Sequence, residues 1–318
     1  MCSSDLRALD LGAYREAMIK QYGHLSLEYV DSTTYDTREL LLTGMFVEQE
    51  ARECAEYVPR VYELPKDERN KLRSAGDLDD DELDEEDLDG HRRAYLDQSP
   101  RPVLQVVDDP DMARLVVLGD PGSGKSTLLR YLLLRWAEGG DESAPLPLLI
   151  ELREYARLRA AGEANGFVHW LASGENARWH LGEAALGDWL DTWPSLVLFD
   201  GLDEVFDPTL RGEVTTAIHR FADEHPLARV VLTSRVIGYQ HPTWRDNGFR
   251  HVMLEDLDEA HIAECLTRWH ERAYVDDPAL GQRKRASLAG AIENSKAIAQ
   301  LAGNPLLLTM MAIINRTQ

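Results

Sequence analysis

The sequence is poor in cysteine and in positive charge, and it has no long apolar segment. Its three cysteines stand far apart in 318 residues, and no pair has the spacing of metal ligands. No stretch approaches the roughly 20 consecutive apolar residues that cross a bilayer. The first 30 residues also lack the charged-then-apolar pattern of a secretory signal. These absences argue against disulfide-rich secreted and membrane-spanning classes, and we expect a reduced, cytoplasmic setting.

Lysine and arginine number 34 against 56 acidic residues, a formal net charge of -22. Such a field repels nucleic acid and anionic membranes, so we expect neither as a partner. Ten of the thirteen residues in "DLDDDELDEEDLD", 77–89, are acidic. Neighbours about 3.5 Å apart repel within a Debye length of about 8 Å, which predicts a disordered insertion over 75–91. A divalent-cation site or a docking tail for a basic partner is the alternative, although an EF-hand spacing is absent.

Short apolar runs alternate with segments of helical period from Pro102 onward. The runs are "LVVLG" at 115, "PLLIEL" at 147, "SLVLFD" at 195, "RVVLTS" at 229 and "HVMLE" at 251. Continuous apolar runs are typical of strands that are buried on both faces, and the helices between them supply the crossovers. The pattern predicts a three-layer α/β domain with a parallel central sheet over 102–256.

The flanking regions have a different character. Residues 1–101 are predicted to form a short, mainly helical leader, with a helix in "YREAMIKQYGHL" and a segment, "LLLTGMFVEQEARE", that begins as a strand. Residues 257–318 have helical periodicity throughout, which predicts a small helical domain beside the sheet. The apolar "PLLLTMMAII" lies directly before the last residues, so we expect a fragment in which this domain is truncated.

The stretch "GDPGSGKS", 119–126, matches G-x-x-x-x-G-K-[ST] between a predicted strand and a predicted helix. Its glycines let backbone amides surround an anion at the positive end of that helix. Lys125 supplies charge to the β and γ phosphates, and the Ser126 hydroxyl is a ligand for Mg²⁺. The residues expected to contact the nucleotide here are Gly119, Asp120, Pro121, Gly122, Ser123, Gly124, Lys125, Ser126 and Thr127.

A second motif, "LVLFDGLDEV" at 196–205, places Asp200 at the end of a buried strand. That end faces the crevice where nucleotides bind in open α/β sheets, so Asp200 is predicted to hold Mg²⁺, usually through water. Glu204 is predicted to orient and deprotonate the attacking water, and Asp203 to position water or metal. The alternative is an acidic loop that merely caps the strand, and it is more serious for Glu204 than for Asp200.

Two further positions carry weaker predictions. The strand "RVVLTS" ends in Thr233 and Ser234, followed by Arg235, and polar groups there are candidates to sense a γ-phosphate. An ordinary surface arginine is an equal alternative for Arg235. Pro305 opens the last predicted helix, where proline is structurally inexpensive, so a simple helix start is a serious alternative for it.

Taken together, these motifs resemble the NACHT family of signal-transducing P-loop ATPases, bacterial type, within the STAND class related to AAA+ proteins. The resemblance covers 102–318 and rests on "GDPGSGKST", "PLLIELREYA", "LVLFDGLDEV", "VVLTSRVIGYQ", "LEDLDEAHIAECLTRW" and "LAGNPLLLTMMAII". It implies that the strand ending at Ser234 lies between those ending at Gly119 and Asp200, so that Arg235 is near the γ-phosphate. It also implies that Pro305 packs near the adenine.

The resemblance further implies a switch: ADP holds a closed monomer, and exchange for ATP permits self-association and effector activation. Bacterial members often serve in antiphage defence. Family members carry a winged-helix domain, whose histidine contacts the ADP β-phosphate, and a carboxy-terminal sensor. Neither is found in these 318 residues, so we expect missing sensor and effector domains.

Three functions remain open from the sequence: a slow ATPase switch, a module that retains ADP or ATP with negligible turnover, and a remodelling motor of the AAA+ kind. The first two are favoured because no pore-like segment can be recognised. A GTPase is disfavoured because no N/T-K-x-D motif occurs. A small-molecule kinase is disfavoured because no acceptor site can be identified.

Overall fold

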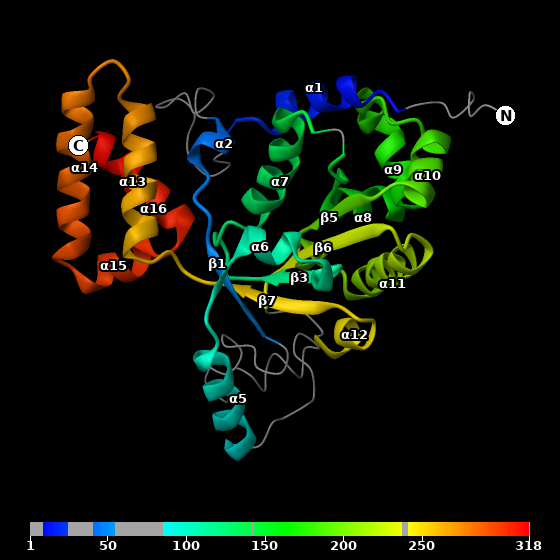
Figure 1. Ribbon diagram of the computed structural model, residues 1–318, viewed down its shortest axis with the longest axis horizontal. Helices are drawn as coiled ribbons and strands as arrows, with labels where there is room; N and C mark the ends of the chain where they lie inside the picture. The colour runs from blue at the N-terminus through cyan, green and yellow to red at the C-terminus, as the bar shows by residue number, and fades with distance from the viewer. Residues whose placement is uncertain (1–8, 25–40, 55–84, 142, 237–240, 318) are drawn as a thin grey trace.

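The computed structural model describes residues 9–24, 41–54, 85–141, 143–236 and 241–317, and it contains one seven-stranded sheet (Figure 1). In spatial order the strands are β2 (Arg101–Pro102), β1 (Glu50–Glu53), β7 (Arg250–Leu254), β3 (Arg114–Leu118), β6 (Ala228–Ser234), β5 (Ser195–Asp200) and β4 (Leu146–Glu151). The five strands from β7 to β4 are parallel and coincide with the five apolar runs. The strand β1 pairs antiparallel with both β2 and β7.

The parallel strands end together at one edge of the sheet. Leu118 is paired in register with Ser234, and Glu151 is paired with Asp200. The apolar residues between 115 and 118 are completely buried, as expected for a central strand that is covered on both faces. β6 lies between β3 and β5, which confirms the predicted order. The loops that carry the two sequence motifs therefore leave the sheet side by side.

Helices cover both faces of the sheet, which confirms the three-layer α/β class. The helix α7 (Lys125–Gly139) lies on one side, with α1 (Leu11–Tyr22) packed on it, and α11 (Pro208–Glu224) lies on the other (Figure 1). The remaining helices of this part are α6 (Val103–Asp108), α8 (Leu152–Ala160), α9 (Phe167–Ala172), α10 (Glu183–Thr192) and α12 (His241–Asp246). Buried leucines at helical spacing, Leu129 and Leu133 among them, attach α7 to the core.

The leader takes part in the same architecture. Its first predicted helix is confirmed as α1, where the buried Tyr14 donates a hydrogen bond to the Pro147 carbonyl of β4 (2.8 Å). The prediction that "LLLTGMFVEQEARE" begins as a strand is wrong. Within the described part of that segment, Leu41 forms an isolated β-bridge with His24, and the helical turn α2 (Leu42–Met45) follows, closed by a bond from the Phe46 amide to the Leu42 carbonyl. The strand β1 comes only at its end.

The predicted acidic insertion, 75–91, is described only in part. Residues 75–84 lie outside the described residues, and residues 85–91 belong to helix α5 (Glu85–Asp97). Among the residues that the structure describes, no cluster of three or more histidine, cysteine or acidic side chains is arranged to hold a metal ion.

The chain after residue 256 is helical, as predicted, and forms a group beside the sheet at the left of Figure 1. Its helices are α13 (Glu259–Ala273), α14 (Pro278–Glu293), α15 (Lys296–Ala302) and α16 (Pro305–Thr317). Asp258, Asp277 and Ser295 cap three of them by accepting a backbone amide three residues ahead. The group has its own apolar core, which includes Leu266 and Trp269. The boundaries at 101/102 and 256/257 stay predictions.

One observation concerns membranes. Within the described ranges, no single helix is long and apolar enough to cross a bilayer. The pair α15 and α16 reaches that length and composition only when joined, and the two are bent by 115° at the break between them.

Candidate functional site

The glycine-rich loop 119–124 joins β3 to α7 and is tightly wound. Gly122 and Gly124 have φ angles of 76° and 93°, which L side chains rarely adopt. A methyl group on Gly124 would also lie 2.9 Å from the Gln49 side-chain oxygen. Ser123 is buried, and its amide donates to the Asp120 carbonyl (3.1 Å). The loop is thus a compact turn at the amino end of α7, the arrangement that binds phosphate.

Lys125 is the first residue of α7 and reaches back over the loop. Its ammonium group donates to the carbonyl oxygens of Gly119 (2.8 Å) and Asp120 (2.9 Å). Burial lowers the pKa of the Lys125 amine, while the nearby carboxylates of Asp203 and Asp200 oppose that effect. The amine is therefore placed at the loop, where an anion would offer it better partners than two neutral carbonyls.

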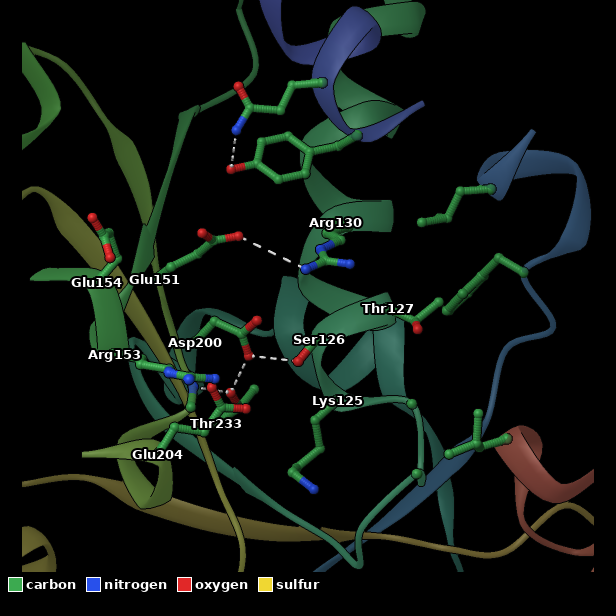
Figure 2. Close-up of a pocket in the computed structure, with 18 of the residues that line it drawn as sticks. Lys125, Ser126, Thr127, Arg130, Glu151, Arg153, Glu154, Asp200, Glu204 and Thr233 are labelled. Carbon is green, nitrogen blue, oxygen red and sulfur yellow. Dashed lines mark hydrogen bonds and ion pairs between the residues drawn. The ribbon is translucent and has the colours of Figure 1, made fainter. Parts of the chain in front are cut away.

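Ser126 and Asp200 meet across the edge of the sheet (Figure 2). The Ser126 hydroxyl donates to Asp200 Oδ1 (2.9 Å), and the Thr233 hydroxyl donates to the same oxygen (2.7 Å). Thr233 also accepts a hydrogen bond from the Gly201 amide (2.9 Å). Instead of facing a phosphate, as sequence suggested for the polar end of this strand, Thr233 holds the Asp200 carboxylate in place. A hydroxyl and a carboxylate oxygen form a donor set that fits Mg²⁺.

Asp203 and Glu204 follow Asp200 on the short 3-10 turn 202–204, but their surroundings differ. Asp203 is bound twice by Arg235, by its backbone amide (2.9 Å) and by its guanidinium (2.9 Å). The Glu204 carboxylate makes no hydrogen bond within the described part of the chain and lines the cavity. Burial first, and then the charges of Asp200 and Asp203, raise the pKa of Glu204. Glu204 thus has the free oxygens and the raised basicity that a general base needs.

Lys125, Ser126, Thr233 and the three carboxylates line one cavity of about 1250 Å³, together with part of the glycine-rich loop. Its polar end holds the glycine-rich loop and the carboxylates. Its other end is largely apolar and lies between the leader, the loop and the helical domain. That apolar end is lined by Leu42, Met45, Phe46, Val47, Leu257, Leu266, Trp269, Pro305, Leu306 and Leu308. The contribution of the leader was not predicted, although Phe46 stacks closely on Tyr131 of α7 (3.9 Å between ring centres).

The start of α16 rests directly on the glycine-rich loop. The Leu306 amide donates to the Gly122 carbonyl (3.2 Å), and the Asn304 side chain donates to the Pro121 carbonyl (2.9 Å). The Leu306 amide also donates to the side-chain oxygen of Asn304 (3.1 Å). Pro305 lies over Gly124, within 3.9 Å of where a side chain would begin. We call Asn304, Pro305 and Leu306 the α16 clasp, because they tie the helical domain to the loop.

A strand, a glycine-rich loop and a helix that carries Lys125 and Ser126, with Asp200 on a nearby parallel strand, define a nucleotide-binding P-loop NTPase. A family model for the NACHT domain matches residues 113–273, from the beginning of β3 to the end of α13, and the chain belongs to the NACHT family. No curated protein matches the chain. The matched range excludes the leader, α14, α15 and α16, and the bacterial type of the family stays a prediction.

The structure brings the predicted site residues together. The loop residues, Asp200, Asp203, Glu204, Arg235 and Pro305 are on the cavity or in the loop that bounds it. Sequence reasoning missed Gln49, Asn304 and Arg153. Gln49 is buried, its amide group donates to the Glu255 carbonyl (3.0 Å), and its oxygen faces Gly124. Arg153 and Asn304 lie within "PLLIELREYA" and "LAGNPLLLTMMAII", two of the segments that carry the family resemblance, but the part of the site that each one faces is far away in sequence.

Proposed function

We propose that the chain binds ATP and ADP with Mg²⁺, hydrolyses ATP slowly, and serves as a nucleotide-controlled signalling switch in the cytoplasm. The observation that carries the catalytic part is the Ser126–Asp200 pair at 2.9 Å, with the Glu204 carboxylate nearby, which has no hydrogen-bond partner among the described residues. The resemblance to bacterial NACHT proteins supports a setting in defence signalling, with self-association in the ATP state and further sensor and effector domains.

Each residue has a role in this proposal. Ser126 and Asp200 would hold Mg²⁺, which supplies positive charge at the β and γ phosphates. Lys125 moves from the carbonyls of the loop to the phosphates. Glu204 orients the attacking water and accepts its proton. Asp203, held by Arg235, keeps the acidic turn in place, so that Arg235 acts on the site through Asp203.

The switch part rests on the α16 clasp. Since the Leu306 amide is bonded to the loop carbonyl of Gly122, a change in the loop on nucleotide exchange reaches the helical domain directly. Pro305 and Leu306 also line the cavity, so the helical domain contributes to nucleotide binding. This is the physical requirement for a switch, because a ligand shifts a conformational equilibrium only through contacts that differ between the two states.

Turnover and assembly state test the proposal together. We expect phosphate release on the order of 10⁻² s⁻¹ or slower, the range of GTPases whose catalytic arginine is supplied in cis. Light scattering after size exclusion should give a monomer with ADP and a larger species with a slowly hydrolysed ATP analogue. Rapid turnover in a stable ring would instead indicate a remodelling motor, and binding with no turnover would indicate a retaining module.

The apolar end of the cavity predicts selectivity for adenine. The Val47 backbone N–H and C=O make no hydrogen bond within the part of the chain that the structure describes, and Val47 lines this end. Adenine presents one acceptor and one donor side by side, which one backbone amide and one carbonyl satisfy. A base whose donors and acceptors are arranged differently leaves a buried polar group without a hydrogen bond, at a cost of about 1 to 3 kcal/mol.

We therefore expect ATP to displace a fluorescent ADP analogue at a concentration roughly tenfold or more below that needed for GTP. Displacement titrations at constant Mg²⁺ measure this ratio. UTP serves as a control for the triphosphate alone, because it presents the same phosphates on a smaller base that lacks the donor and acceptor arrangement of adenine. Equal displacement by ATP and GTP would contradict the adenine assignment and leave the phosphate site intact.

A further inference from the structure

Arg153 is a cation at the polar end of the cavity to which none of the motif predictions gave a role. It lies in the first turn of α8, two residues after Glu151, and Glu151 is paired in register with Asp200. Its side chain extends into the cavity toward Asp200 and Glu204 (Figure 2). This position of Arg153 follows from the sheet. β4 ends beside β5, so the segment that follows β4 lies beside the acidic turn that follows β5.

Arg153 also has no bonded partner among the residues that the structure describes. Within the described ranges its guanidinium makes no hydrogen bond and no ion pair. The other four arginines on the cavity have partners: Arg130 with Glu151 (3.7 Å), Arg157 with Glu154 (2.6 Å), Arg178 with Gln21 (3.0 Å) and Arg235 with Asp203 (2.9 Å). Among the described residues that line the cavity, Arg153 is therefore the one arginine that can take up an anion without first giving up a bond.

An anion that binds beside Arg153 needs a nearby cation, because this end of the cavity already holds several carboxylates. Asp200, Asp203 and Glu204 all lie at this end of the cavity, and the charge on Arg153 partly opposes the rise in the pKa of Glu204. A γ-phosphate that enters beside these carboxylates brings further negative charge. Lys125 offsets it from the side of the glycine-rich loop, and Arg153 is placed to do so from the side of β4. The planar guanidinium fork matches two phosphate oxygens at once.

We propose that Arg153 binds the γ-phosphate of ATP and stabilises the charge of the phosphoryl group during its transfer. Arg235 keeps its place on Asp203 and positions the acidic turn. In the step, the water oxygen bonds to the γ-phosphorus, the bond from that phosphorus to the β–γ bridging oxygen breaks, and its electron pair leaves with ADP. Glu204 takes the proton from the water. This inference rests on the proposed function, since it requires ATP in the cavity.

Calorimetry with two ligands tests the contact without relying on turnover. The variants are Arg153→Ala and Arg153→Lys, and the titrants are ADP and a non-hydrolysable ATP analogue, both with Mg²⁺. For Arg153→Ala we expect ADP affinity within twofold of wild type and analogue affinity lower by about tenfold, because the lost bonds reach only the γ-phosphate. Arg153→Lys should recover part of the analogue affinity. Single-turnover hydrolysis by Arg153→Ala should fall by roughly a hundredfold or more.

Two comparison variants complete the design. Arg159→Ala removes an arginine from the same helix that pairs with Glu213 (3.6 Å) outside the cavity lining, and it should change neither affinity. Arg235→Ala should lower turnover with a smaller change in the ratio of the two affinities. An unchanged ratio in Arg153→Ala, or an analogue-specific loss only in Arg235→Ala, overturns the proposal.

The outcomes separate this inference from the proposed function. If the wild-type protein binds the analogue but does not hydrolyse ATP, the ATPase assignment fails, and the ratio of analogue to ADP affinity still decides the Arg153 contact. If both affinities fall equally in Arg153→Ala while its thermal unfolding is unchanged, the arginine serves general phosphate attraction and the γ-phosphate contact is excluded.

Discussion

Replacing Glu204 with glutamine should abolish measurable ATP turnover and leave ATP affinity within about twofold of wild type. Glutamine has nearly the same shape and can still orient water, but it cannot accept a proton. Loss of a general base typically costs a factor of about 10² to 10⁴ in rate. The Glu204 side chain makes no hydrogen bond in the described part of the protein, so the substitution leaves no partner unsatisfied. Phosphate release and calorimetry measure the two quantities.

The pH dependence gives a second measure of the same group. Burial and the neighbouring carboxylates raise the pKa of Glu204. Since the base acts as the carboxylate, turnover should rise with pH through that pKa, and this acid limb should lie above the ordinary glutamate value of about 4.3. Glu224→Gln, on an exposed residue at the end of α11, is the matched control. Normal hydrolysis by Glu204→Gln would place the base elsewhere.

Replacing Lys125 with alanine should weaken both ADP and ATP binding by at least tenfold. Each charge-assisted hydrogen bond to a phosphate is worth about 1.5 to 3 kcal/mol, and about 1.4 kcal/mol is a factor of ten in affinity. The lysine already lies over the loop, 2.8 Å from the Gly119 carbonyl, so little rearrangement is needed to reach a phosphate. Calorimetry with each nucleotide gives the change.

The control for this variant is Lys296→Ala, which removes the same charge from an exposed position at the start of α15. Because Lys125 also bonds two carbonyls of the loop, a thermal unfolding curve should accompany the titration. Unchanged affinity in Lys125→Ala would rule out the phosphate assignment.

The sheet and the phosphate end of the site could be predicted from sequence for the same reason. The strands are buried on both faces, so each is a continuous apolar run, and each motif follows its strand within a few residues. The structure of the leader was harder to predict from sequence. β1 has only four residues and lies near the edge of the sheet, where pairing and not hydrophobicity defines it. The turn α2 before it was therefore mistaken for the beginning of the strand.

The rest of the site depends on tertiary contacts that no local pattern carries. Its apolar end joins three segments, near Phe46, Leu266 and Pro305, that are far apart in sequence. The hydroxyl of Thr233 finds Asp200 only because β6 lies beside β5. The resemblance to the family drew attention to Arg235. Its bond to Asp203, and the lack of a partner for Arg153 among the described residues, could be seen only in three dimensions.

The bond from the Leu306 amide to the Gly122 carbonyl has a practical consequence. When the two segments separate, this amide keeps only its bond to the Asn304 side chain, so its proton exchanges with deuterium more readily. Deuterium uptake at the first turn of α16 therefore reports the separation of the helical domain from the glycine-rich loop. It can be read in each nucleotide state without any label attached to the protein.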